Sequence, residues 1–190
     1  MTGHDEADGA LVALARDGDD RAFAELLRRH KPSLYGFVRR YVSDADAAVD
    51  VVQESFVSAW RALARYDARR PFAVWLRAIA INKCRDRARR LAVRRFILGD
   101  RDAQSAEALA KADPAPVGEA NLISAERRAA FKRAIDQLPA KLKEPLLLTC
   151  FDDLTQQEAA DILGVTVKTI ETRVYRARQR LAQLLDHASI

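Results

Sequence analysis

Basic side chains crowd one short stretch in the first half of the chain. Between residues 83 and 95 the only acidic residue is Asp86. The basic residues there are Lys83, Arg85, Arg87, Arg89, Arg90, Arg94 and Arg95. This density exceeds what solubility requires, and guanidinium groups pair well with phosphate oxygens. The stretch therefore indicates a nucleic-acid partner.

Two other kinds of side chain share a predicted helix face with this stretch. Trp75, Ala78, Asn82, Arg85 and Arg89 follow one another at intervals of three or four residues, which is the spacing of one helical stripe. An aromatic ring can stack on an unpaired base, and an amide can bond to a base edge. The stripe therefore suits a single strand, although plain core packing explains Trp75 equally well.

A helix-turn-helix is predicted near the C-terminus. Thr155 and Glu158 have capping-box spacing, and Gly164 should end the helix that they start, because glycine accepts the left-handed backbone. Thr166 is expected to cap a second helix from Val167 to about residue 185. Two helices joined by a short turn with glycine are typical of DNA-binding domains.

The second helix of this motif separates an apolar face from a polar one. The inward stripe is Ile170, Val174, Ala177, Leu181 and Leu185. The polar residues near the N-terminal end are Lys168, Thr169, Thr172, Arg173 and Arg176. Arginine can bind guanine O6 and N7, and lysine or threonine can bind phosphates, so this end fits the major groove. Glu171 argues against binding at its own position, because a carboxylate repels phosphate unless a cytosine amine donates to it.

Helices are expected throughout, because glycine and proline are scarce and no segment alternates like a strand. In the first half they are predicted over about 21–41, 43–63 and 72–90. Asp20 is expected to cap the first helix, and Ser43, with Asp46 in capping-box spacing, the second. Pro32 should kink or split the first helix. The apolar stripe of the second is Val49, Val52, Phe56, Trp60 and Leu63.

The predicted fold class is all-α, with two small helical domains joined by a linker. The first domain is expected over 1–92, the linker over 93–124 and the second domain over 125–190. The linker is rich in alanine from 103 to 121 and holds Pro114, Pro116 and Gly118 close together. This composition favours a flexible centre.

Composition and motifs argue against several classes of protein. The chain has 190 residues and a formal net charge of +5, which fits two domains and weakly favours a polyanionic partner. No apolar run approaches the roughly 20 residues of a membrane helix, and no signal peptide is recognised, so a cytoplasmic location is expected. Cys84 and Cys150 are expected to be ordinary thiols. The chain has no phosphate-binding glycine loop, metal-ligand cluster or nucleophile–base spacing, so no enzyme, metal, cofactor or small-molecule substrate is predicted.

A polar edge is predicted on the second helix. Asp46, Asp50, Gln53 and Glu54 fall away from the stripe that contains Val52. By spacing alone, this edge is best interpreted as an ordinary solvated face.

With these residues in view, the chain resembles a minimal sigma factor of the extracytoplasmic-function group in the sigma-70 family. The first half carries DAAVDVVQESFVSAW at 46–60, FAVWLRAIAIN at 72–82, and then Asp86, Arg89 and Arg90. The second half carries Leu138 and Pro139, followed by LTQQEAADILGVTVKTIETRVYRAR at 154–178. Both blocks occur in family order, so the two predicted domains would be sigma domain 2 and sigma domain 4.

The resemblance implies roles for the matched positions. The clamp helices of the largest polymerase subunit would bind Val49, Asp50, Gln53 and Glu54, which replaces the interpretation of a merely solvated face. The loop with Asp67, Arg69 and Arg70 would receive a base flipped from the −10 element. The melted strand would be held by Trp75, Asn82, Arg85 and Arg89. The −35 element would be read by Lys168, Thr169, Thr172, Arg173 and Arg176.

The resemblance implies three partners. They are polymerase core, which would bind through its clamp helices and its flap; promoter DNA; and a separate anti-sigma protein. Glu171 departs from the family, whose members often carry lysine there. The linker is short, and no additional sensor domain is expected.

The alternative function is that of a helix-turn-helix activator or repressor, which binds duplex operators without polymerase. The second half permits that function, whereas the single-strand features of the first half argue against it.

Overall fold

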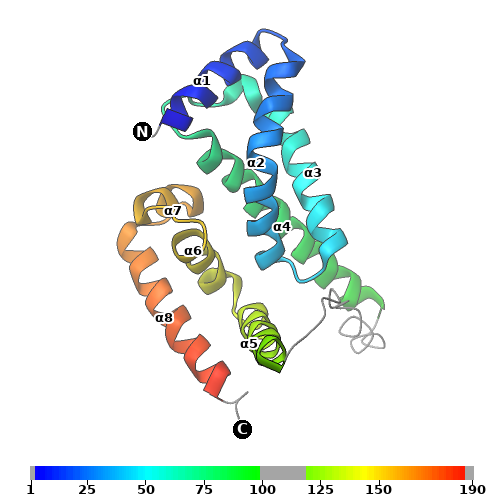
Figure 1. Ribbon diagram of the computed structural model, residues 1–190, viewed down its shortest axis with the longest axis vertical. Helices are drawn as coiled ribbons and strands as arrows, with labels where there is room; N and C mark the ends of the chain where they lie inside the picture. Colours follow the sequence, from blue (N-terminus) through cyan, green and yellow to red (C-terminus); the bar gives the residue numbers. More distant parts are fainter. Residues whose placement is uncertain (1–2, 99–118, 187–190) are drawn as a thin grey trace.

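The computed structural model describes residues 3–98 and 119–186, which form eight α-helices, one short 3₁₀ helix and loops (Figure 1). These residues contain no β-strand, and the predicted all-α class is confirmed. None of the described helices is both long and apolar enough to cross a membrane. The centre of the predicted linker lies outside the described residues.

The first half is a bundle of four helices. They span Gly3–Arg16 (α1), Asp20–Tyr41 (α2), Ala45–Ala62 (α3) and Phe72–Leu98 (α4), with a 3₁₀ helix at Leu63–Arg65. Their largest fully buried side chains are Leu26, Leu34, Phe37, Phe72, Leu76 and Ile81. Burial of each such side chain contributes roughly 1.5–3 kcal/mol. This core holds α3 and α4, which carry the polar residues singled out in the sequence.

Two helix starts in the first half differ from the predictions. Asp19 rather than Asp20 caps α2, and its carboxylate accepts bonds from the backbone N–H groups of Arg21 at 2.8 Å and Ala22 at 3.3 Å. Asp44 rather than Ser43 caps α3 and accepts from the N–H of Ala47 at 2.6 Å. At each start two neighbouring residues could serve as caps, and the residue that does so has an extended backbone, as a capping residue requires.

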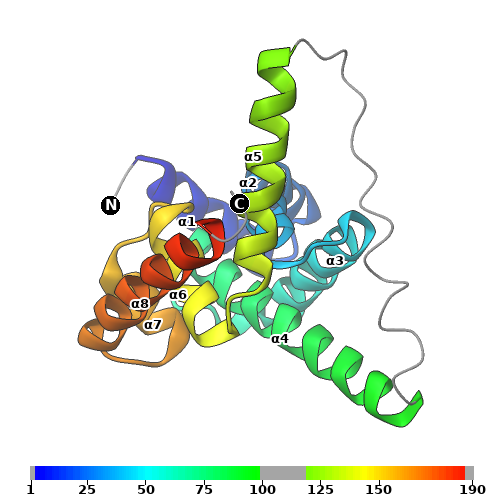
Figure 2. The same cartoon turned by 90° about the horizontal axis from the view of Figure 1, so that it is seen from below.

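Other differences concern helix length. α1 was not predicted, because only Val12 and Ala15 of its apolar residues are buried, and its periodicity is weak. α2 passes through Pro32 without a break, since packing on both sides of the proline holds one helix. α4 continues past its predicted end near Arg90 to Leu98, and its last turns project from the bundle (Figure 2).

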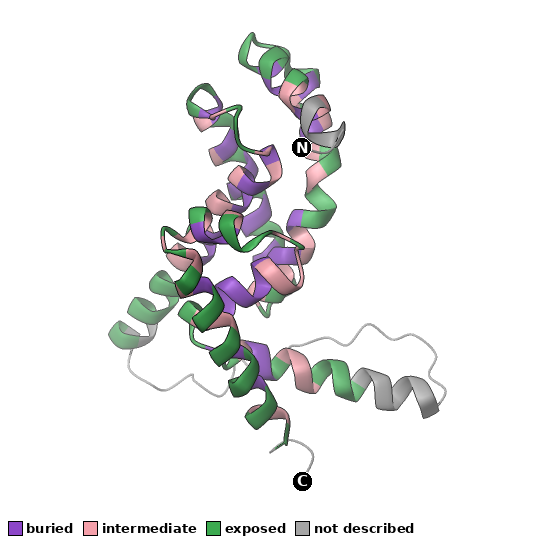
Figure 3. Cartoon of the chain, turned by 90° about the vertical axis from the view of Figure 1, so that its left-hand side faces the viewer, coloured by how far each residue is buried: buried purple, intermediate pink, exposed green. Residues whose placement is uncertain are grey.

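The second half is a smaller helical unit. It contains Glu119–Asp136 (α5), Ala140–Cys150 (α6), Gln156–Leu163 (α7) and Val167–Asp186 (α8). Its main buried apolar residues are Ile135, Leu138, Leu146, Leu147, Leu148, Ile170, Ala177 and Leu181. Much of the surface of α8 opposite this core is exposed (Figure 3).

The predicted helix-turn-helix is confirmed as α7 and α8. Thr155 and Glu158 form both bonds of the capping box. Gly164 follows α7 with φ of 65°, a left-handed conformation that costs a glycine little. Thr166 accepts a bond from the N–H of Thr169 at 3.2 Å and so caps α8.

The two halves pack against each other. Helix α4 contacts α7, and α2 contacts α5 and α6 (Figures 1 and 2). The hydrophobic core consequently continues from one half into the other. The side chains at this junction include several charged groups, and these bear directly on the candidate DNA-binding surface.

Candidate nucleic-acid and polymerase interfaces

The polar edge of α3 is exposed as one continuous face. Val49, Asp50, Gln53 and Glu54 are all exposed. The last three, with Lys83 of α4, line a hollow of about 510 Å³. The Glu54 carboxylate lies 4.0 Å from the Lys83 ammonium and 3.8 Å from the Arg90 guanidinium. This edge is therefore an acidic and amide-bearing surface beside the basic face of α4.

An apolar groove lies next to this edge, between α2 and α3. It has a volume of about 440 Å³ and is lined by Phe23, Leu27, Lys31, Val52, Gln53, Phe56, Val57 and Trp60. Trp60 is 39% exposed and meets the Phe23 ring edge-on, with centroids 4.7 Å apart. Such a groove, shared through Gln53 with the polar edge, suits the side chains of a partner protein.

The groove corrects one sequence prediction. Val49 and Trp60 were placed in the buried stripe of α3, but each is 39% exposed. Only Val52, Phe56 and Leu63 of that stripe are buried. The true core face is centred on Val52 and Phe56, so residues at the margins of the stripe remain accessible. The exposed positions of Val57 and Trp60 could have been inferred from their helical spacing to Gln53.

The loop before α4 is organised by its own side chains. The carboxylate of Asp67 accepts a bond from Arg69 Nη2 at 2.8 Å, and another from the Arg69 backbone N–H at 3.1 Å. These bonds lower the pKa of Asp67 to about 2. The Tyr66 hydroxyl donates to the backbone oxygen of Arg70. The loop thus presents exposed guanidinium groups on a defined backbone turn.

Trp75 and Asn82 lie in different environments on α4. The Trp75 ring is half-buried and packs against Tyr66 and Phe72, with centroids 5.0 and 5.7 Å away. Packing therefore occupies part of the ring, and part is accessible. Asn82 is exposed. Its amide oxygen accepts a long bond from Arg85 Nη1 at 3.5 Å, and no hydrogen bond is described for its NH₂ group, which can therefore donate to a ligand.

Arg85 is engaged by the second half of the chain. Its Nε donates to Glu144 Oε1 at 2.8 Å and its Nη2 donates to Oε2 at 2.6 Å. The Arg85 side chain is 37% exposed, whereas that of Glu144 is 4% exposed. The hydrogen bond from Arg85 to Glu144 raises the pKa of the guanidinium. Arg89, one turn further on, is exposed and pairs with Asp86 of its own helix.

The exposed end of α8 carries the predicted −35 residues. Lys168 is 86% exposed along its side chain and lies 3.4 Å from the Glu171 carboxylate. The hydroxyl of Thr172 donates to the backbone oxygen of Lys168 at 2.9 Å. Within the described part of the chain, no ion pair or side-chain hydrogen bond engages Arg173 or Arg176. Both guanidinium groups are therefore available to a polyanion.

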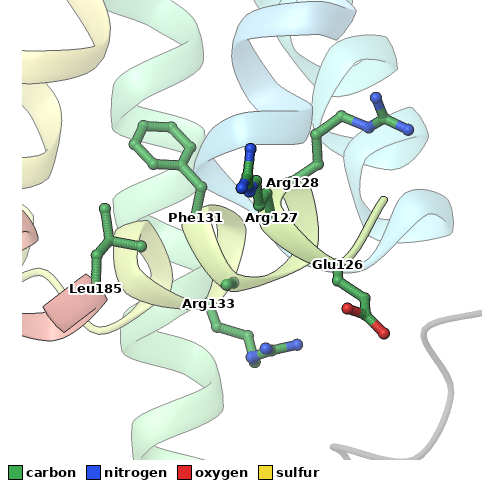
Figure 4. A pocket seen from close by; sticks show the side chains of 7 residues that line it. Glu126, Arg127, Arg128, Phe131, Arg133 and Leu185 are labelled. Carbon is green, nitrogen blue, oxygen red and sulfur yellow. The ribbon is translucent and has the colours of Figure 1, made fainter. Parts of the chain in front are cut away.

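A further hollow lies where α5 meets the end of α8. It has a volume of about 870 Å³ and is lined by Glu126, Arg127, Arg128, Ala130, Phe131, Arg133 and Leu185. Figure 4 shows Phe131 and Arg133 on α5 and Leu185 at the end of α8, three of the side chains that line it. None of its lining residues was predicted as a site residue from the sequence.

Family models match both halves of the chain. Residues 26–94 match Sigma-70 region 2 and residues 128–181 match Sigma-70 region 4. The RNA polymerase sigma factor CnrH of Cupriavidus metallidurans is 37% identical over 185 residues, covering 96% of each chain. The ECF RNA polymerase sigma-E factor of Haemophilus influenzae is 30% identical, covering 92% of this chain and 93% of the relative.

Two solved structures share this arrangement of helices. The structure of CnrH in complex with the cytosolic domain of CnrY has a TM-score of 0.69 at 33% identity, and the match covers 95% of this chain and 98% of CnrH. The sigma factor RpoE of Bartonella quintana, in complex with the anti-sigma factor NepR, has a TM-score of 0.65 at 27% identity. That match covers 86% of this chain and 96% of RpoE.

The helical fold and the family matches of both halves together define a transcription factor with two helical regions that works with RNA polymerase. The chain belongs to the sigma-70 family of RNA polymerase sigma factors, within its extracytoplasmic-function group. Such a factor directs polymerase core to specific promoters and promotes DNA melting when transcription starts.

Proposed function

We propose that the work of this sigma factor is divided between its two halves. The first half, residues 1–92, binds polymerase core and the −10 element. The second half, residues 125–190, reads the −35 element, and residues 93–124 link the two halves. The observation that carries this division is the match of each half to a different sigma region, in family order. The separate exposed polar faces on α3, α4 and α8 support it.

Core polymerase binds the edge of α3. Asp50, Gln53 and Glu54 supply polar contacts to the clamp helices of the largest subunit, and Val49 supplies an apolar one. The neighbouring groove with Trp60 enlarges this surface, because central aromatic side chains carry much of the energy of protein interfaces. The flap of the polymerase contacts the second half.

The −10 element is bound by the loop before α4 and by one face of that helix. Asp67, Arg69 and Arg70 surround a base flipped from the stack. The melted strand lies along the face formed by Trp75, Asn82, Arg85 and Arg89. Unstacking a base costs a few kcal/mol, which stacking and hydrogen bonding to the protein can offset.

The −35 element is read in the major groove by the N-terminal end of α8. Arg173 and Arg176 contact base edges or phosphates, and Lys168, Thr169 and Thr172 fix the position of the helix. Glu171 engages Lys168 in the free protein and disfavours phosphate at its own position. The factor forms and breaks no covalent bond in this mechanism, so its action rests on binding energy alone.

A separate anti-sigma protein inhibits the free factor. This part of the proposal is supported by the two similar structures, in which CnrH is bound to CnrY and RpoE is bound to the anti-sigma factor NepR.

In vitro transcription with core polymerase and a library of genomic fragments tests this function. The factor should direct specific transcripts only when core is present, and footprints should cover both a −35 and a −10 element. A duplex-binding activator or repressor would instead protect an operator without polymerase. Tight, specific protection by the free factor would therefore overturn the proposal.

A further inference from the structure

The last residue of α1 holds the backbone on both sides of the 3₁₀ helix that follows α3. Helix α1 ends at Arg16, and Arg16 Nε donates to the backbone oxygen of Leu63 at 2.9 Å. Its Nη2 donates to the backbone oxygen of Tyr66, and its guanidinium carbon lies 5.8 Å from the centre of the Tyr66 ring. One side chain of α1 therefore fixes the point where the 3₁₀ helix passes into the loop before α4 (Figure 1).

The chemistry of this place favours an arginine. Carbonyl oxygens at the C-terminal end of a helix carry partial negative charge, and a cationic side chain beside them is stabilising. The planar arginine fork can donate to two acceptors at once, a geometry that the compact ammonium of lysine lacks. The two acceptors lie 47 and 50 residues beyond Arg16 in the chain, so only the folded bundle makes this contact.

Helix α1 is itself anchored to the bundle. Val12 and Ala15 are buried in the core. The Asp8 side chain is only 6% exposed, and its Oδ2 is hydrogen-bonded to His30 Nε2 of α2 at 2.6 Å. Its Oδ1 accepts a bond from Arg29 Nη1 of the same helix at 3.3 Å. These contacts set the position of α1, so the side chain at its end can act as a fixed support.

Tyr66 carries this support through the loop. The residue is 5% exposed, and its ring packs against Trp75 with centroids 5.0 Å apart. Its hydroxyl donates to the backbone oxygen of Arg70, whose N–H in turn donates to the backbone oxygen of Asp67 at 3.0 Å. The loop is thus held at its start by Arg16 and near its end by the Tyr66 hydroxyl.

We propose that Arg16 is a positioning residue for recognition of the −10 element, because it holds the loop before α4 in the conformation that receives the flipped base. The proposal rests on the function assigned above to Asp67, Arg69 and Arg70. The described bonds and ring contact of Arg16 reach none of these three side chains, so Arg16 acts through the backbone and through Tyr66. Helix α1 thereby takes part in promoter selection without contacting the base.

A loop that is already held binds a base more tightly than a loose one. Ordering a loose segment during binding costs conformational entropy, and a preorganised loop avoids this cost. If loss of the two carbonyl contacts lowers the population of the competent loop to about a tenth, the apparent affinity for the strand falls about tenfold. The loss concerns only the base that enters the loop, because the rest of the strand is bound by the face of α4.

The test uses polymerase core assembled with the full-length factor. Arg16→Ala is the main variant, and Arg21→Ala is its matched control, because it removes the same charge from a nearby exposed position at the start of α2. Tyr66→Phe removes only the hydroxyl that holds the end of the loop, and Tyr35→Phe on α2 is its control. Circular dichroism and titration of labelled core check that each factor folds and assembles. Tyr66→Phe carries the same test should Arg16→Ala fail to fold.

The measured quantity is the affinity of each assembled polymerase for fluorescent single-stranded oligonucleotides. One oligonucleotide carries the −10 sequence found by the transcription assay, and the others carry an abasic site at each −10 position in turn. The parent should lose affinity where the missing base is the one that enters the loop. Arg16→Ala should bind the intact strand about tenfold more weakly, yet match the parent on the strand that lacks this base. Tyr66→Phe should show the same pattern, and both controls should match the parent on every strand.

Other patterns overturn the positioning role. Equal weakening of intact and abasic strands by Arg16→Ala would show a general loss of structure, and unchanged affinity on all strands would show that the loop needs no support. A salt dependence reduced by about one phosphate contact, and restored by Arg16→Lys, would show that Arg16 binds the DNA backbone directly.

Failure of the function assigned to the loop appears separately. If Arg70→Ala responds to every abasic site as the parent does, the loop does not receive the base, whatever the behaviour of Arg16→Ala.

Discussion

The guanidinium of Arg85 and the carboxylate of Glu144 are separated by 59 residues of sequence but form a two-point ion pair, with bonds of 2.8 and 2.6 Å. The pair joins a helix of the polymerase- and −10-binding half to a helix of the −35-binding half. A residue proposed to hold promoter DNA is therefore already bound to a carboxylate in the free chain.

Tyr41→Phe should weaken this junction without abolishing it. The change removes one of three bonds to a buried carboxylate, and a hydrogen bond to a charged group contributes about 1.5–3 kcal/mol. A loss of that order is expected in the free energy of unfolding measured in urea. Tyr35→Phe is the control, because no hydrogen bond engages the Tyr35 hydroxyl within the described residues, and equal losses in both variants would refute this role of Tyr41.

Cys84 should report on the same junction. The thiol is 1% exposed, and burial, with the nearby Glu144 charge, raises its pKa to about 12. Since the ordinary cysteine pKa is about 8.5, the thiol stays neutral at pH 8, and the folded state loses stability as the pH rises above 8.5. In a Cys150→Ser background, labelling by a thiol reagent at pH 8 should be slow. It should accelerate with Glu144→Gln and stay slow with Glu126→Gln, which removes the same charge from an exposed position on α5.

Charge reversal on α3 should weaken binding to polymerase core. Asp50→Lys places a cation where the proposed interface has an acid, whereas exposed substitutions usually change stability by only about 0.5 kcal/mol. Titration of labelled core should show a clearly higher Kd, with normal thermal unfolding of the factor. Asp17→Lys, an exposed position between α1 and α2, is the control. Equal core affinity for both variants would remove Asp50 from the interface.

Loss of the arginines on α8 should reduce transcription from promoters that depend on a −35 element. Arg173→Ala and Arg176→Ala should each cost roughly 1–3 kcal/mol if a base contact is lost, and should relax specificity at one position. Arg180→Ala, further along α8, is the control and should transcribe normally. Competition among promoters with single −35 substitutions measures the effect, and normal discrimination by both variants would contradict the recognition role.

Asn82→Ala should impair promoter opening while leaving core affinity and duplex recognition intact. Its exposed amide is proposed to bond to an unstacked base, and the contact described for its side chain is a long bond accepted from Arg85 Nη1 of the same helix at 3.5 Å. Permanganate modification of unpaired thymines measures opening directly. Reactivity equal to that of the parent factor would show that this amide is not needed for melting.

The local structure of the second half follows closely from its sequence. The Thr155–Glu158 box, Gly164 and Thr166 are short-range signals, so they identify the helix-turn-helix and its exposed basic residues without the rest of the fold. The all-α class follows in the same way from residue propensity. Boundaries were less certain wherever adjacent residues could cap equally well, as with Asp19 beside Asp20.

Only the tertiary structure decided which charged groups meet across the chain. Glu144 has no distinguishing neighbour in the sequence, and its partners Tyr41 and Arg85 lie 103 and 59 residues away. Local periodicity predicts which face of a helix is buried, but it carries no information about which distant helix covers that face. The sequence by itself therefore determined most of the helices, though not α1, and which polar side chains lie on their exposed faces. The packing of α6 against α2 and α4 determined that Arg85 is withheld, because a desolvated acid requires donors that only the assembled fold provides.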